Sequence, residues 1–223
     1  MRLMRIWTNA LAMKRPFGQK LTLTKIDAAE VQLKAAVRMY FENRHLVPIY
    51  TLANAVREVV GRLGEHLDVE TMQKGIAKAR GLTVAELIGP MSKKAGFFKH
   101  ADRNQSEKIE LEDDDVEMVL FFACHDFGRI AHGMPIEAQV FEAWAYAATI
   151  ERVSDAPLRR QELIRRMIAA FPGIRGAPDR AAQKRIGLEI MERAVGDKSL
   201  EMAITREVPG KPRSGVIKKK AKD

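Results

Sequence analysis

Residues 113–133, DDDVEMVLFFACHDFGRIAHG, constrain the fold more than any other part of the chain. Three aspartates at the start and a glycine at the end match the charge and capping preferences of an α-helix. Apolar residues recur on one face at helical spacing, and more apolar bulk lies opposite. The first face holds Val116, Val119, Leu120, Ala123, Phe127 and Ile130, and the other Met118, Phe121 and Phe122. Because such a helix is normally buried between layers, we predict a central helix with very low exposure along 119–127.

Helical periodicity also dominates the rest of the chain, with only brief strand-like alternation near 108–112 and 201–208. Segments 25–43 and 48–63 predict an antiparallel helical hairpin that Gly64 ends. Further helices are predicted over 68–80, from 83 to 101 with a break at Pro90, and over 135–152, 158–171 and 179–195. The predicted fold is an all-α bundle around the central helix, with a smaller basic helical extension.

The charge pattern divides the chain into four parts. Residues 1–20 form a basic N-terminal arm of charge +5, and residues 209–223 a basic tail of charge +5. Between them, residues 21–153 are predicted to form the bundle and residues 154–208 the extension. The formal charge of residues 21–208 taken together is −1. The net charge of +9 therefore comes from the two ends.

Composition indicates a globular protein of one domain, or one domain with a small appendage. The chain has 223 residues, 46% of them hydrophobic, with no apolar run long enough for a membrane span or a signal-peptide core. Its single cysteine, Cys124, lies inside the central helix and permits no internal disulfide. This favours a reducing, cytoplasmic location.

Basic side chains cluster on the 158–171 helix and in the tail. They are Arg159, Arg160, Arg165, Arg166, Lys211, Arg213, Lys218, Lys219 and Lys220. Such clusters contact nucleic-acid phosphates or an acidic protein, or they are solvated, flexible ends. We therefore predict a non-enzymatic binding or scaffolding protein that contacts nucleic acid through its basic arms. An alternative is a homodimer in which Phe121 and Phe122 are buried between two copies of the chain.

Four sequence strings within residues 21–144 together resemble a known protein family. The strings TKIDAAEVQLKAAVRMYFE, PIYTLANAVREVV, FFKHADR and FEAW follow one another in that order. Together they resemble a family of bacterial helical proteins of unknown function with a hallmark close to NFFKHADRDP. Gly96 stands where that hallmark has asparagine, and Asn104-Gln105 replaces its Asp-Pro. The resemblance implies a compact helical domain and no particular activity.

A local resemblance offers an enzymatic alternative. The string ACHDFGRI, residues 123–130, is similar to the His-Asp motif of HD-domain phosphohydrolases, which are all-helical metalloenzymes. The resemblance implies His100, His125, Asp126 and Asp155 as ligands of a divalent metal such as manganese or iron. Such a metal would activate water against a phosphate ester. The competing interpretation is structural: His125 makes a hydrogen bond, and Asp126 pairs with a cation such as Arg129.

A second enzymatic alternative rests on Arg38 and His45, which have six residues between them. This spacing resembles the arginine-histidine pair of the HEPN class of helical RNases. Against it, the pair spans the end of the first helix instead of lying late in the bundle. The sequence offers no phosphate-binding glycine-rich loop and no Cys-Cys metal spacing.

Overall fold

The computed structural model describes residues 21–100, 106–150 and 158–197, and these residues form helices without any strand. In chain order they are α2 (Lys25–Phe41), α3 (Leu46–Leu67), α4 (Met72–Arg80), α5 (Val84–Lys99), α6 (Asp113–Ala131), α7 (Ile136–Thr149), α8 (Leu158–Ala170), the 3-10 helix η2 (Ile174–Gly176) and α9 (Arg180–Gly196). The predicted all-α fold is confirmed. Within these ranges no helix combines the length and the apolar character that crossing a membrane requires.

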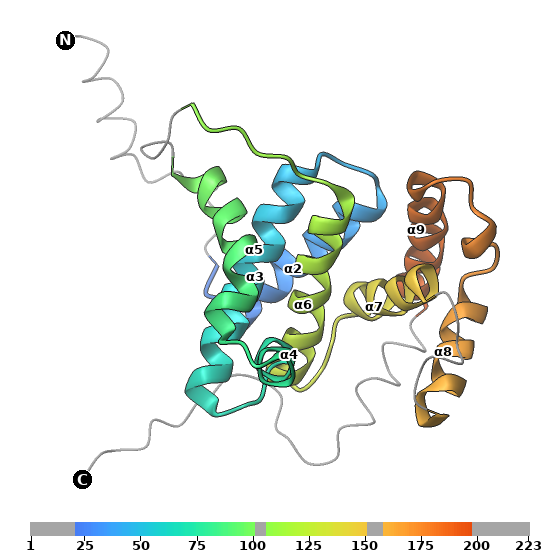
Figure 1. Ribbon diagram of the computed structural model, residues 1–223. Helices are drawn as coiled ribbons and strands as arrows, with labels where there is room; N and C mark the ends of the chain where they lie inside the picture. Colours follow the sequence, from blue (N-terminus) through green and yellow to red (C-terminus); the bar gives the residue numbers. More distant parts are fainter. Residues whose placement is uncertain (1–20, 101–105, 151–157, 198–223) are drawn as a thin grey trace.

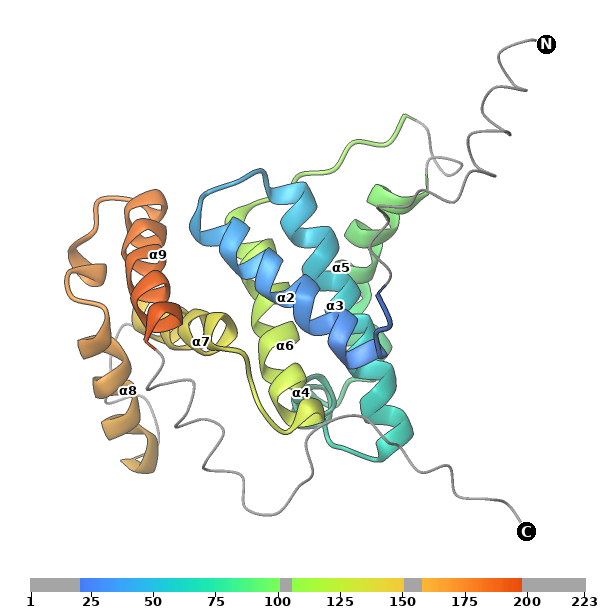
Figure 2. The same cartoon turned by 180° about the vertical axis from the view of Figure 1, so that it is seen from behind.

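The predicted central helix is α6, which lies between α3 and α7 in both views of the molecule (Figures 1 and 2). It contacts α2, α3, α4 and α7. Val119, Leu120 and Ala123 are fully buried, whereas Met118 on the other side is 52% exposed. Phe122 is buried and Phe121 is half-buried, so this pair is largely covered within one chain. The low exposure predicted for this stretch is confirmed, although solvent reaches one edge of the helix.

Side-chain caps set the starts of α2, α5 and α9, at or next to the predicted positions 25, 83 and 179. Thr24 and Asp27 form a reciprocal capping box at α2, and Thr83 and Glu86 form another at α5. Asp179 caps α9 by accepting a hydrogen bond from the amide of Ala182. These motifs need only three or four adjacent residues, which is why the sequence alone reveals them.

Gly64 does not end the second helix, and the prediction of a stop there is wrong. Helix α3 continues to Leu67, and Asp68 adopts the left-handed conformation that ends it. Gly64 is buried inside the helix, where a Cβ would lie 2.7 Å from Cγ2 of Thr71 and 3.3 Å from Cδ1 of Ile130. The glycine is therefore needed for close packing rather than for a turn.

Two further predicted boundaries are corrected. Helix α5 runs through Pro90 without a break, because the proline is exposed while Met91 and Ala95 pack in the core on the other side. A proline removes one amide hydrogen bond, and this packing offsets the loss. At the end of α6, His132 rather than Gly133 takes the left-handed conformation.

Helices α8 and α9 lie together at one side of the bundle (Figure 2); α8 packs against α7, and α9 packs against both α7 and α2. The indole Nε1 of Trp144 donates to the carbonyl of Gln183, at 2.9 Å. Lys184, only 1% exposed, pairs with Asp113, and its Nζ lies 4.4 Å from the centre of the Tyr40 ring. These contacts attach α9 to α2, α6 and α7. The predicted boundary between bundle and extension, at 153–154, lies outside the described residues.

The three tyrosines lead to a prediction about alkaline unfolding. Burial raises the pKa of Tyr50 to about 12, and burial beside Glu117 raises the pKa of Tyr40 well above its usual value. Burial also raises the pKa of Tyr146. Above pH 10 the unfolded chain loses phenolic protons that the folded chain retains, so the free energy of unfolding should fall. The expected slope is about 1.4 kcal/mol per pH unit for each tyrosine.

Denaturant titrations at several pH values above 9 would measure this slope. Phenolate absorbance of the folded protein provides the control, because it should stay low until the protein unfolds. Ionisation of all three tyrosines near pH 10 with the fold intact would contradict the prediction.

Candidate functional site

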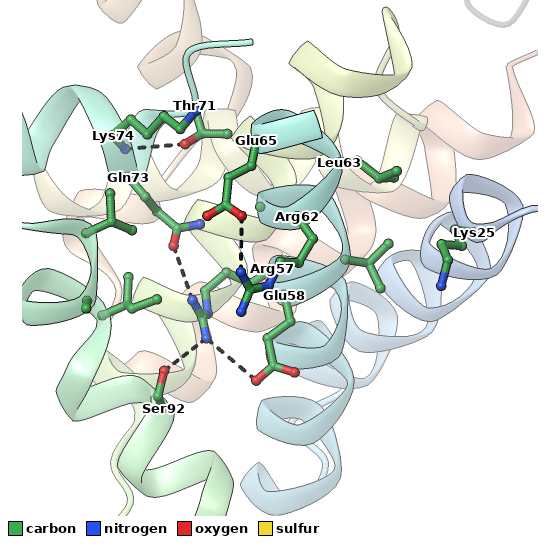
Figure 3. Close-up of a pocket in the computed structure, with 15 residues that line it drawn as sticks. Lys25, Arg57, Glu58, Arg62, Leu63, Glu65, Thr71, Gln73, Lys74 and Ser92 are labelled. Atoms are coloured by element: carbon green, nitrogen blue, oxygen red, sulfur yellow. Dashed lines mark hydrogen bonds and ion pairs between the residues drawn. The ribbon is translucent and has the colours of Figure 1, made fainter. Parts of the chain in front are cut away.

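A cavity of about 740 Å³ opens beside α3, α4 and α5, and the side chains around it are drawn in Figure 3. Its apolar lining comes mainly from Val59, Leu63, Val84 and Ile88. Charged and polar side chains line the rest, with Arg57 of α3 among them. A cavity of this size and mixed character fits a small molecule.

The guanidinium of Arg57 is held in place by neutral oxygens of Asn54, Gln73 and Ser92, which come from three helices; Figure 3 shows the contacts with Gln73 and Ser92. Arg57 is 2% exposed. Its Nε and Nη2 donate to Oδ1 of Asn54 at 3.1 and 2.8 Å, and its Nη1 donates to Oε1 of Gln73 at 3.1 Å. Nη2 also lies 3.4 Å from Oγ of Ser92. The nearest carboxylate oxygen belonging to the cavity lining, on Glu58, is 3.9 Å from Nη2.

This arrangement follows from the helical positions of the residues. Asn54 and Arg57 are three residues apart on α3, so their side chains lie on one face. Asn54 also donates from Nδ2 to Glu58, at 2.8 Å. Because Arg57 is almost fully buried, loss of hydration lowers the pKa of its guanidinium. Asn54, Gln73 and Ser92 together accept from four of the five N–H groups of Arg57, so the guanidinium links α3, α4 and α5.

Gln73 links Arg57 to Asp126. While Oε1 of Gln73 accepts from Arg57, its Nε2 donates to Oδ2 of Asp126, at 3.0 Å. The two neighbours fix the orientation of the amide, because a flip would set donor against donor. Oδ1 of Asp126 accepts from the backbone amide of Met72 at 2.6 Å, at the first turn of α4.

Asp126 is fully buried, and its observed partners differ from the expected one. We expected a cation such as Arg129, but Arg129 is exposed and the carboxylate instead binds Met72 and Gln73. Burial raises the pKa of Asp126, and the hydrogen bond from Met72 opposes this rise. Asp126 therefore fastens α4 to α6.

His125 points to a different neighbour. Its Nδ1 lies 2.9 Å from Oε1 of Glu142 on α7, and its ring stacks on Phe121. Successive residues of a helix diverge by about 100°, so His125 and Asp126 take partners from α7 and α4 respectively. The expected hydrogen bond of His125 is present in the structure.

The remaining members of the HD-like set are placed separately. His100 is the exposed C-cap residue of α5, and Asp155 lies outside the described residues. Across residues 21–100, 106–150 and 158–197 no group of three histidine, cysteine or acidic side chains could hold a metal. The divalent-metal hypothesis stays a prediction.

The two residues of the HEPN-like set have local partners. Arg38 lies in the last turn of α2, with its Nη1 4.0 Å from Glu42. His45 caps α3, and its Nδ1 accepts from the amide of Val47 at 3.3 Å. The RNase hypothesis also stays a prediction.

The arginines expected to bind nucleic acid lie on α8. Arg160, Arg165 and Arg166 are exposed there. The side chain of Arg159 and the tail residues Lys211, Arg213, Lys218, Lys219 and Lys220 lie outside the described part of the structure. The structure therefore places three of these nine side chains.

Sequence reasoning missed the Arg57 cavity. Asn54 and Arg57 interrupt the apolar face that Ala53, Val56 and Val60 form on α3, and polar residues at such positions indicate a buried network. Gln73 gave no comparable signal, because its partners come from distant parts of the chain.

Comparisons with protein-family models, curated proteins and solved structures find no match for the chain. The resemblance to a bacterial helical family therefore stays an expectation.

Proposed function

We propose that this chain is a non-enzymatic nucleic-acid-binding protein that contacts phosphate backbones through α8, α9 and the basic tail. The proposal rests on the uneven distribution of basic and acidic side chains along the chain. Residues 158–197 hold nine basic and five acidic side chains, whereas residues 21–150 hold fifteen basic and nineteen acidic ones. The basic tail, residues 209–223, adds a further charge of +5. A basic side of this kind attracts polyanions over several ångströms.

The arrangement of α8 supports this use. Ile164 and Phe171 are buried against the rest of the protein, while the side chains of Arg165 and Arg166 are 58% and 77% exposed. Both arginines pair with Glu162 on the same helix, which is itself well exposed. Exposed pairs of this kind contribute little to stability, so phosphates can replace them at small cost.

Binding should be largely independent of sequence and should weaken steeply with salt. Lysines and arginines that neutralise phosphates release counterions, and each contact adds about 0.9 to the slope of log affinity against log salt. Changing Arg160, Arg165 and Arg166 to glutamate should weaken binding at least tenfold and make the slope shallower by about 2–3. Fluorescence anisotropy with DNA and RNA duplexes at several salt concentrations measures both effects.

A matched variant separates position from net charge. Changing Lys78, Arg80 and Lys93 to glutamate alters the charge equally at exposed sites on the bundle, and it should weaken binding much less. Equal weakening by both variants would contradict the proposed surface. A chain ending at residue 208 tests the tail and should also bind weakly. If the intact protein binds neither nucleic acid at about 50 mM salt, the proposal fails and a protein partner becomes the better hypothesis.

A further inference from the structure

We propose that the nucleic acid bound by this chain is single-stranded, and that its unpaired bases stack on an aromatic patch formed by Phe121, His125 and Tyr146. This inference rests on the proposed function, because it names the form of nucleic acid that the basic surface binds. Three observations support it: the rings reach the surface, their neighbours hold them in one geometry, and arginines lie next to them.

The rings of the patch reach the surface, unlike those of the aromatic core. Phe141 and Trp144 of α7 are fully buried, whereas Tyr146 on the same helix is half-buried. Phe121 is half-buried as well, and Met118, one turn earlier on α6, is 52% exposed. Aromatic groups that meet water lose part of their hydrophobic stabilisation, so a group of them at the surface indicates a binding site.

Neighbouring contacts hold the rings in one geometry. Nδ1 of His125 lies 2.9 Å from Oε1 of Glu142, which orients the imidazole while 29% of the side chain stays exposed. The planes of His125 and Phe121 are 13° apart and their centres 6.5 Å apart, a distance at which neither ring fully covers the face of the other. Tyr146 meets Phe121 edge-on, with centres 5.5 Å apart. Rings that are oriented before binding lose little conformational entropy when a base stacks on them.

Two arginines lie next to the patch. Arg129 follows His125 by one turn of α6 and is exposed. Burial and Glu142 raise the pKa of Tyr146, whereas the nearby positive charge of Arg160 on α8 opposes this rise. Helix α7 lies between α6 and α8 (Figure 1) and packs against both, which brings the patch beside the basic surface of α8. Rings beside arginines suit a strand whose phosphates and bases bind together.

This arrangement favours a single strand over a duplex. The bases of a duplex are paired and stacked on one another, so their faces are not available to side chains on a protein surface. Every base of a single strand has a π-face that can stack on an aromatic ring, whatever the sequence. Binding of this kind is therefore independent of sequence and still selects unpaired nucleic acid.

Fluorescence anisotropy of the full chain tests the proposal with three labelled probes. They are a DNA strand of about 12 thymidines, an abasic strand of the same length, and a duplex of the same length. The abasic strand has the same phosphates without the bases, so it isolates the contribution of stacking. We expect the thymidine strand to bind roughly tenfold more tightly than the abasic strand, and more tightly than the duplex.

Variants locate the stacking surface. Phe121→Leu combined with His125→Gln removes two rings but keeps apolar bulk and a group that can donate to Glu142. This double variant should reduce the preference for thymidine over abasic strand to less than about twofold and leave duplex binding unchanged. Phe97→Leu is the matched control, because Phe97 is 36% exposed on α5 and also contacts a second ring, that of Phe98. It should leave the preference intact.

The outcomes separate this inference from the proposed function. Equal binding of the thymidine and abasic strands would overturn stacking, and tighter binding of the duplex would overturn the choice of a single strand. Both results leave the α8 surface standing if glutamates at Arg160, Arg165 and Arg166 weaken every probe. A thymidine preference that persists when those glutamates have no effect would remove the α8 surface alone.

Further results bear on the patch itself. A preference that survives in the double variant would place the bases elsewhere, and an equal loss in Phe97→Leu would show a general effect. Absence of binding by all three probes would overturn both proposals. If circular dichroism shows that the double variant fails to fold, the comparison of thymidine and abasic strands on the unaltered chain still decides whether bases are contacted.

Discussion

Replacing Asp126 with alanine is expected to lower the free energy of unfolding at pH 7 by about 3 kcal/mol. The change leaves the amide of Met72 and Nε2 of Gln73 without their acceptor in a fully buried position. It also removes the carboxylate that Gln73 connects to Arg57. Urea unfolding followed by circular dichroism measures the loss. An exposed acid replaced in the same way, Glu110→Ala, should change stability by less than about 0.5 kcal/mol.

The same variant distinguishes the structural interpretation from the HD-like one. If His125 and Asp126 were metal ligands, alanine at either position should abolish binding of manganese or iron and leave the fold largely intact. From their contacts we expect unequal losses of stability instead, with His125→Ala costing about 1 kcal/mol because its hydrogen bond to Glu142 is only partly buried. Stoichiometric metal in the purified protein that is lost in His125→Ala would contradict this view.

Gly187→Ala is expected to lower stability by about 3 kcal/mol and to loosen α9. A Cβ at this position would lie within 3.0 Å of three carbons of the Phe41 ring. Phe41 cannot move aside easily, because it is buried among Tyr40, Phe141 and Trp144 with ring centres 5.6–6.0 Å away. Thermal unfolding measures the stability, and fluorescence in a Trp7→Phe background, where Trp144 is the one remaining indole, reports the packing of α9.

Gly75→Ala provides the matched control. Gly75 lies inside α4, and a Cβ there would meet nothing within 4 Å. Alanine should therefore raise stability by about 0.5–1 kcal/mol, through helix propensity alone. If both variants stabilised the protein equally, the close approach of α9 to Phe41 would be disproved.

The helices and the starts of α2, α5 and α9 could be predicted because their signals are local, whereas α4 begins at Met72 and not at the predicted 68. Apolar periodicity identifies α6, and Thr24, Thr83 and Asp179 cap helices with groups only three residues away. The charge difference between the two halves is likewise a property of composition. None of these features depends on how distant segments meet.

The errors at Gly64 and Pro90 have a common cause. A glycine can end a helix or permit a close approach, and a proline can break a helix or lie on its exposed side. The neighbours decide between these outcomes, here Thr71 and Ile130 for Gly64 and the packing of Met91 for Pro90. For Gly64 the deciding neighbours lie outside its helix, and for Pro90 the deciding fact is which face of α5 meets the core, so the local pattern is ambiguous.

The sequence by itself determined an all-α chain with a buried α6 and a basic C-terminal part. Only the tertiary structure decided what Asp126 and Arg57 do. Gln73 connects these two residues, which are 69 positions apart, by accepting from one and donating to the other. Hydrogen bonds require groups within about 3 Å, and the packing of α3, α4 and α6 brings these groups to that distance. Helical periodicity predicts which face of a helix is buried, but not which side chain of another helix it meets there.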